Sequence, residues 1–204
     1  MTAVGRVEVV VFDLGGVVCK FEPEARLAAL AVATGLDEAQ IKDAIWTSGL
    51  DAAADRGELE LADALASVIA ALGHRIAEAP LLQAWTKAFV PDPAVVELAN
   101  SLDRQTAIFT NNGPMLEECM HRGLVRAGDA FDPILFAGHL RATKPDPISY
   151  ERAAAALGHD AAALLLVDDA EKNVSGALQS GWRAIHFESP AQLEQELRVA
   201  GVSA

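Results

Sequence analysis

The sequence predicts an α/β protein in which a doubly wound, parallel, five-stranded sheet carries one inserted helical bundle. Two observations indicate this fold. Short apolar runs rich in β-branched residues recur along the 204-residue chain with helical patterns between them, and one interval between two runs is much longer than a crossover helix requires. Near-continuous apolar strands that alternate with helices are typical of parallel sheets covered on both faces.

Five strands are expected from these runs. In chain order they cover residues 7–12, 106–109, 134–136, 164–167 and 184–187. The helices between the later strands have conventional boundaries. Pro114 suits a first helical turn, Gly158 ends a helix over 147–157, and Gly181 ends another over 173–180. A last amphipathic helix is expected over 188–198.

The interval between the first two strands is too long for a simple crossover. About 100 residues separate Asp13 from Thr110, where a crossover unit needs about 30. The excess shows no strand-like run, and its periodicity predicts helices over about 24–34, 38–47, 61–72 and 79–89, with Trp46 and Trp85 in the core of the bundle. We therefore expect a core of residues 1–16 and 92–204 and a helical insert of residues 17–91, joined at 17–21 and at 91–93.

Composition narrows the classes of partner. The chain has 16 Lys and Arg against 29 Asp and Glu, for a formal net charge of −13. Binding to nucleic acid or to an anionic membrane needs clustered basic side chains, so neither partner is expected. The longest apolar stretch near the N-terminus, 7–18, is interrupted by Glu8 and Asp13 and suits neither a signal peptide nor a membrane span. Cys19 and Cys119 fit neither a disulfide framework nor a metal spacing. We expect a cytoplasmic monomer or homodimer.

Side chains capable of chemistry follow successive strands. Asp13, Gly15 and Gly16 follow the first strand, Thr110 and Asn111 the second, Lys144 the third, and Asp168 and Asp169 end the fourth. Ligands bind outside the carboxyl ends of the strands in a parallel α/β sheet, so these groups are expected to converge. Each alone has an ordinary explanation as a turn, a helix cap or a solvated loop. Their joint order favours a site.

This set of side chains suits phosphoryl transfer. A phosphate ester repels a carboxylate nucleophile such as Asp13, so a cation must bridge the two, and the Asp168-Asp169 pair could hold Mg²⁺ there. Lys144 would neutralise the remaining charge. The Thr110 hydroxyl and nearby backbone N–H groups would hold the phosphoryl oxygens. The two glycines after Asp13 would let backbone groups approach the metal and the phosphate.

The order of these residues resembles the four motifs of the haloacid dehalogenase-like (HAD) hydrolase superfamily over nearly the whole chain. The matching stretches are FDLGGVV, DRGELEL, FTNNG, TKPDPISYERA and LLLVDDAEKNVSGALQSGW. They are similar to the subclass with a helical cap, and most similar to its sugar-phosphate phosphatase branch. The resemblance implies a Rossmann-like core with the Asp13 strand at its centre, and a Mg²⁺-dependent phosphatase acting on small phosphorylated metabolites, with sugar phosphates as candidates.

The resemblance also implies a role for each site residue. Asp13 would be the nucleophile that forms an aspartyl-phosphate, Lys144 would bridge, and Thr110 would bind the phosphoryl group together with Asn111 and Gly16. Asp13, Asp169 and the backbone carbonyl of Gly15 would ligate Mg²⁺, Asp168 would assist, and Asn173 would steady the acidic loop.

One position departs from the family pattern. Most phosphatases of this superfamily carry a second Asp two positions after the nucleophile as general acid and base, and here Gly15 stands there. A similar Gly occurs in the sugar-phosphate branch. Positioned acid–base catalysis contributes roughly 10²- to 10⁴-fold, so we expect a slower enzyme or one that acts on better leaving groups.

Three other functions use a similar set of residues. A haloacid dehalogenase shares the nucleophile and the lysine but needs no metal, so the Asp168-Asp169 pair speaks against it. A phospho-receiver domain places its acidic pair first in the chain, whereas here the pair comes last. A protein of this fold that only binds a phosphorylated metabolite or a partner protein stays an alternative.

Overall fold

The computed structural model describes residues 6–127 and 130–203, so the ends of the expected core, 1–5 and 204, lie outside the described residues. Five parallel strands form one sheet in the order β5-β4-β1-β6-β7. They are β1 (Val9–Phe12), β4 (Gln105–Thr110), β5 (Ile134–Phe136), β6 (Leu164–Asp168) and β7 (Arg183–His186). The predicted parallel sheet is confirmed, and the strand that leads to Asp13 is central.

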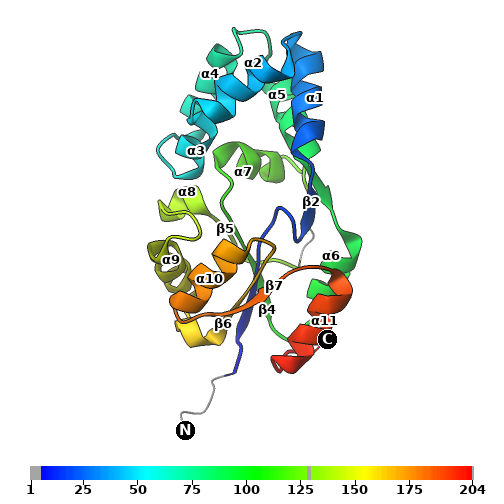
Figure 1. Ribbon diagram of the computed structural model, residues 1–204, viewed down its shortest axis with the longest axis vertical. Helices are drawn as coiled ribbons and strands as arrows, with labels where there is room; N and C mark the ends of the chain where they lie inside the picture. The colour runs from blue at the N-terminus through cyan, green and yellow to red at the C-terminus, as the bar shows by residue number, and fades with distance from the viewer. Residues whose placement is uncertain (1–5, 128–129, 204) are drawn as a thin grey trace.

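Helices cover both faces of the sheet, which explains why β1 is apolar throughout, why β6 is apolar up to its last residue, Asp168, and why both are fully buried. One face carries α9 (Pro147–Leu157) and α10 (Glu171–Gln179), and the other carries α6 (Pro93–Ser101) and α11 (Pro190–Val199) (Figure 1). Proline stands in the first turn of α6, α9 and α11, where its missing N–H has no partner to lose. The predicted boundaries of α9, α10 and α11 hold to within two residues.

The helical insert, residues 23–88, lies beyond the carboxyl end of the sheet, at the top of Figure 1. It contains α1 (Pro23–Thr34), α2 (Glu38–Lys42), α3 (Leu50–Asp55), α4 (Leu61–Ala71) and α5 (Glu78–Trp85). The helix expected over 38–47 is divided, because its second half is a π-helical turn over Asp43–Thr47. The short helix α3 was not predicted. A small helical bundle at this point of the chain is confirmed.

Two short strands join the insert to the core, and the expectation of no strand in this interval was wrong. Strand β2 (Cys19–Phe21) pairs antiparallel with β3 (Phe89–Pro91). The helix expected over 79–89 ends at Trp85, and a 3₁₀ turn over Thr86–Ala88 leads into β3. The reason is a long-range contact, since the rings of Phe21 and Phe89 pack with centroids 5.4 Å apart. Pairing with a strand some 70 residues away overrides the local helical periodicity.

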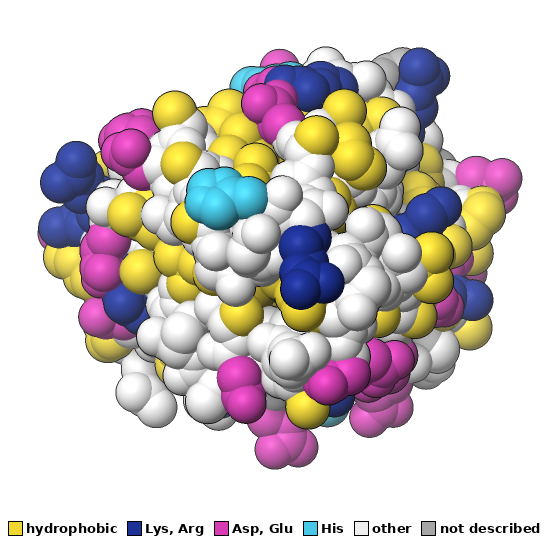
Figure 2. Space-filling model, turned by 90° about the horizontal axis from the view of Figure 1, so that it is seen from above, with side chains coloured by type: hydrophobic (Ala, Val, Ile, Leu, Met, Phe, Trp, Pro, Cys, Tyr) yellow, Lys and Arg dark blue, Asp and Glu magenta, His cyan; other side chains and the backbone are white. Residues whose placement is uncertain are grey.

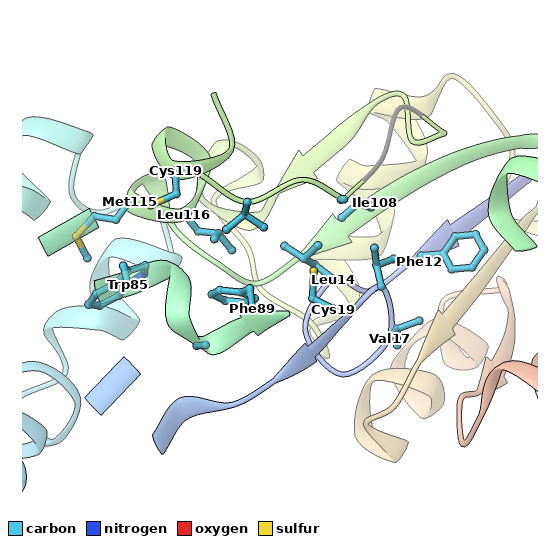
Figure 3. Close-up of a cluster of buried hydrophobic side chains, with 14 of the residues drawn as sticks. Phe12, Leu14, Val17, Cys19, Trp85, Phe89, Ile108, Met115, Leu116 and Cys119 are labelled. Carbon is cyan, nitrogen blue, oxygen red and sulfur yellow. The ribbon is translucent and has the colours of Figure 1, made fainter. Parts of the chain in front are cut away.

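Helix α7 (Pro114–His121) of the core packs against α4 and α5 of the insert. The interface belongs to one buried cluster that runs from the end of β1 to the insert. Figure 3 shows it, with Leu14 toward Phe89 of β3 and with Met115 of α7 toward Trp85 of α5; β2 and β3 are called the hinge strands below. A shared apolar core of this kind restrains the insert, so a wide opening motion would expose buried side chains.

Glycines permit an even closer approach at the end of α3. A Cβ on Gly113, in the loop after β4, would stand 2.9 Å from the backbone carbon of Ala54. A Cβ on Gly57 would stand 2.1 Å from the carbonyl oxygen of Gly138, which belongs to α8 (Ala137–Leu140). No side chain fits at either contact. The insert therefore meets the core backbone to backbone, directly beside the carboxyl edge of the sheet.

The end of the insert that faces solvent has a mixed surface. In Figure 2 acidic, basic and apolar side chains are interspersed across this face, without a single large basic area. Within 6–127 and 130–203, no helix combines the length and the apolar character needed to cross a membrane.

Candidate active site

The carboxyl edge of the sheet brings together the four charged residues that the sequence singled out. Asp13 follows β1, Asp168 ends β6, and Asp169 is the next residue. The Nζ of Lys144 donates to Asp13 Oδ1 at 2.8 Å and to Asp168 Oδ2 at 2.6 Å. Lys144 is only 3% exposed. Its buried ammonium links the ends of β1 and β6, which are adjacent in the sheet although Asp13 and Asp168 are 155 residues apart in the chain. The predicted convergence is observed.

Burial and mutual charge set the pKa values in this cluster. Burial raises the pKa of Asp13 to about 6, and the neighbouring Asp168 adds to the rise, while Lys144 opposes it. Burial opposes the charged form of Lys144, but the two carboxylates outweigh it and raise the pKa of the lysine. Lys144 therefore stays positively charged, and the carboxylate of Asp13 is more basic than that of an ordinary aspartate.

Asp168 is held by neighbours on several sides. The Nδ2 of Asn173 donates to both of its oxygens, at 2.9 and 3.1 Å, and the backbone N–H of Ala170 donates to Oδ1 at 3.0 Å. The side chain of Asp169 is exposed by contrast, and burial of its surroundings together with the charge of Asp168 raises its pKa. The buried carboxylate of Asp168 thus positions Lys144, while the carboxylate of Asp169 is exposed and lies beside Gly16.

The loop after β4 contributes through two asparagines. Asn111 forms a two-point contact with the backbone of Lys144, accepting from its N–H at 2.8 Å and donating to its carbonyl at 2.9 Å. The Nδ2 of Asn112 donates to the Oγ1 of buried Thr110 at 2.7 Å. Since that oxygen accepts from Asn112, the hydroxyl hydrogen of Thr110 is free to donate to a ligand. Helix α7 begins after Gly113, so the Thr110-Asn111 pair does not cap it.

Asn112 was missed at the sequence level. The repeated Asn after Thr110 gave the only signal, and nothing in the sequence says which of the two amides faces the hydroxyl. The structure gives Asn111 a positioning contact with Lys144, and it gives Asn112 the contact with Thr110.

The two glycines after Leu14 have different roles. Gly16 has φ of +98°, and a Cβ there would stand 2.3 Å from Oδ2 of Asp169. Only glycine therefore lets the backbone approach this carboxylate. At Gly15 a Cβ would make ordinary contacts, 3.5 Å from the ring of Phe89 and 3.6 Å from that of Phe21. The side of the site where an acid would stand is walled by the two phenyl rings of the hinge strands.

The donor set fits a magnesium ion. Oxygen atoms of Asp13, Asp168 and Asp169 lie within 4.8 Å of one another. Three carboxylates against one ammonium leave an excess of negative charge, and carboxylate and carbonyl oxygens are the ligands that Mg²⁺ prefers. The missing Cβ at Gly16 keeps the space beside Asp169 open to a backbone group. The residues present therefore suit a hard divalent cation.

The parallel sheet and the charged side chains at its carboxyl edge define a class of protein: hydrolases of the α/β class with a Rossmann-like core. A family model for haloacid dehalogenase-like hydrolases matches residues 7–181. The chain belongs to this family, as the motifs predicted.

Solved structures of the same fold cover almost the whole chain. A HAD family enzyme from Bacteroides thetaiotaomicron, in complex with magnesium and inorganic phosphate, superposes with a TM-score of 0.77 at 16% identity, over 92% of this chain and 98% of that one. A predicted HAD-like family hydrolase from Porphyromonas gingivalis gives a TM-score of 0.78 at 18% identity, over 95% and 98%. An L-2-haloacid dehalogenase from Xanthobacter autotrophicus gives 0.60 at 22% identity, over 97% and 85%. The search among curated proteins found no match.

Proposed function

We propose that the protein is a Mg²⁺-dependent phosphatase that hydrolyses small phosphorylated metabolites, sugar phosphates among the candidates, through an aspartyl-phosphate on Asp13. The cluster of three carboxylates, Asp13, Asp168 and Asp169, carries the proposal, because a dehalogenase needs no metal ion beside its nucleophile. The Bacteroides thetaiotaomicron enzyme, which has the same fold and was solved with magnesium and inorganic phosphate, supports the proposal by analogy. In this proposal residues 17–91 are the cap, and 1–16 with 92–204 the catalytic core.

Each side chain has one task in the proposed reaction. Lys144 holds Oδ1 of Asp13, so Oδ2 is the atom that attacks phosphorus and displaces the alcohol of the ester. Thr110 donates its free hydroxyl hydrogen to a phosphoryl oxygen, and the backbone at Gly16 stands beside the same group. Water then cleaves the aspartyl-phosphate, which returns Asp13 and releases phosphate.

The cation would be held by Asp13, Asp169 and the carbonyl of Gly15, with Asp168 nearby. When bound it would neutralise the charge between nucleophile and phosphoryl group. Asn111 acts in this proposal as a positioning residue for Lys144, since its carboxamide already contacts the lysine backbone at both ends.

The test is phosphate release from a panel of phosphorylated metabolites and 4-nitrophenyl phosphate, with and without Mg²⁺. Asp13→Asn is expected to lower turnover at least about 10³-fold while the fold is kept, because an amide of the same shape cannot attack phosphorus. Asp63→Asn, an exposed carboxylate on α4, is the matched control and should be unchanged. If the Asp13→Asn variant turned over substrate as fast as the wild-type protein, Asp13 would be excluded as the nucleophile. Chloride release from L-2-chloropropionate without metal would favour the dehalogenase. Binding of a phosphorylated metabolite without turnover would favour the non-catalytic alternative.

A further inference from the structure

A buried arginine in the insert lacks the partners that a buried charge normally has. Arg26 of α1 is 5% exposed, and its Nε makes no hydrogen bond to any described residue. The carboxyl groups of Asp51 and Asp55 attract it through charge alone, without a hydrogen bond. A buried guanidinium with free donors is costly unless an acceptor reaches it.

Aromatic rings cover the guanidinium instead. Its carbon Cζ lies 4.5 Å from the ring centroid of Trp85, 5.1 Å from that of Trp46 and 5.7 Å from that of Phe21. The two indoles are themselves stacked, with centroids 6.0 Å apart. These rings stabilise the charge and hold the plane of the guanidinium, but a ring face accepts no conventional hydrogen bond from the N–H edge. The Nε–H is therefore left without an acceptor among the described residues.

Arg26 lines a pocket of about 420 Å³, a volume typical of small-molecule sites. Its walls are mainly apolar, from Phe21, Pro23, Leu27 and Trp46. Phe21 stays 46% exposed although one side of its ring packs against Phe89. The charged lining residues besides Arg26 are Lys42, Glu24 and Asp51, and the Asp51 carboxylate already accepts from Trp46 Nε1 at 2.9 Å.

The pocket adjoins the catalytic edge. Phe21 also stands against Gly15, two residues from the nucleophile. Asp51 also lines a narrow crevice together with Asn112, which contacts the hydroxyl of Thr110. Phe21 and Asp51 therefore connect the wall of the pocket with the surroundings of Asp13 and Thr110.

We propose that this pocket binds the carboxylate of an organic acid that carries the phosphate, with Arg26 as the residue that selects it. A guanidinium held in plane by aromatic rings presents a fork of N–H donors, and a carboxylate is the planar acceptor that matches it with two hydrogen bonds. The apolar walls take the carbon skeleton of the acid. The inference rests on the proposed function for its phosphoryl end, and on the insert alone for its carboxylate end.

The activity test compares phenyl phosphates that carry a carboxylate with those that carry a carboxamide of the same shape, at each of the three ring positions. The wild-type protein should prefer one carboxylate isomer about 10- to 100-fold in kcat/KM, as expected for a charge-assisted pair. Arg26→Met should remove that preference, Arg26→Lys should reduce it, and Arg75→Met, an exposed arginine of the insert, should keep it. Equal rates for both esters, or an equal loss for both in Arg26→Met, would overturn the proposal.

A binding test separates this proposal from the phosphatase function. Benzoate, but not benzamide, should quench the fluorescence of Trp46 and Trp85 in the full-length protein, and Arg26→Lys should weaken benzoate binding about tenfold. If no ester is hydrolysed while benzoate still binds through Arg26, the phosphatase proposal fails and the carboxylate subsite stands. If benzoate and benzamide act alike, the subsite fails whatever the esters show.

Discussion

The two regions of the molecule treat a buried cation in opposite ways. In the core, Lys144 is paired with two carboxylates, at 2.8 and 2.6 Å, and its backbone is held by Asn111. In the insert, Arg26 is also buried, but aromatic rings surround it and none of the described residues accepts a hydrogen bond from its Nε. In the core, the charge of Lys144 is therefore paired before any ligand binds. In the insert, the Nε–H of Arg26 lacks a hydrogen-bond acceptor among the described residues. In our proposals the core positions the catalytic groups, and the insert selects the ligand.

Removing the two cations should show this difference most strongly. Lys144→Met leaves Asp13 and Asp168 buried without their counter-charge, so the free energy of unfolding should fall by about 3 to 5 kcal/mol in metal-free buffer. Arg26→Met breaks no hydrogen-bonded ion pair among the described residues. Relief of the buried charge offsets the lost ring contacts and the lost attraction of Asp51 and Asp55, so its stability should stay within about 1 kcal/mol of wild type. Denaturant unfolding of both variants measures the difference.

The matched control for the core is Lys172→Met, an exposed lysine on α10 that should change stability by less than about 0.5 kcal/mol. A loss in Arg26→Met as large as in Lys144→Met would mean that both cations are structural and that the contrast between the two regions is false.

The acidic neighbours of Arg26 sharpen the comparison through pH. Burial raises the pKa of Asp55 from an ordinary 3.8 to about 8, and the charge of Asp51 adds to the rise, while the Gly113 backbone and Arg26 oppose it. The folded protein thus keeps a proton that the unfolded chain has lost, and this group lowers the stability progressively as pH rises from about 4 to about 8. Asp55→Asn should remove that decline and be more stable than wild type at pH 9.

Thermal unfolding midpoints between pH 5 and 9 measure this effect, with Asp63→Asn as the control for loss of an exposed carboxylate in the same insert. Parallel pH profiles for Asp55→Asn and wild type would show that Asp55 is ionised in the folded protein. The insert would then carry more negative charge near Arg26 than we infer.

The sequence predicted the core better than the insert, for a physical reason. Strands β1, β4 and β6 are buried on both faces, so their near-continuous apolar runs can be recognised in the sequence. Ligands of a parallel sheet bind at its carboxyl edge, so the polar residues that follow these runs are the candidates for a site. Asp13, Lys144, Asp168 and Asp169 were found in this way. Arg26 was not, because a single arginine in an amphipathic helix has the same pattern whether it faces solvent or three aromatic rings.

The hinge strands show the same limit. Cys19–Phe21 and Phe89–Pro91 are three residues long, too short for an alternating pattern, and Phe89 continues the helical periodicity of the segment before it. Only their pairing across the chain makes them strands. The roles of Asn111 and Asn112 after Thr110 were equally ambiguous. Two adjacent asparagines look the same in the sequence whichever of them contacts the hydroxyl of Thr110.

Gly15 lies where the two regions meet, and a side chain there offers the finest test of how they cooperate. Its backbone is outside the left-handed region, and a Cβ would make only ordinary contacts with Phe21 and Phe89. Gly15→Asp should therefore fold. Its carboxyl would stand beside two apolar rings, which favour the protonated form and raise its pKa toward the range of a general acid.

Without an acid at this position the departing alkoxide receives little help, so its own basicity should control the rate of the native protein. Aryl and acyl phosphates, or a sugar's anomeric 1-phosphate, should then be better substrates than primary alkyl phosphates. Gly15→Asp should flatten the dependence of log kcat/KM on leaving-group pKa and raise the rate for the poorest leaving groups by up to about tenfold. That is less than the roughly 10²- to 10⁴-fold of an evolved acid, because nothing orients the new carboxyl. Gly15→Asn has the same shape without the proton, so equal slopes for the Asp and Asn variants would mean that the proton already comes from elsewhere, with the acidic residues of the insert the first place to look.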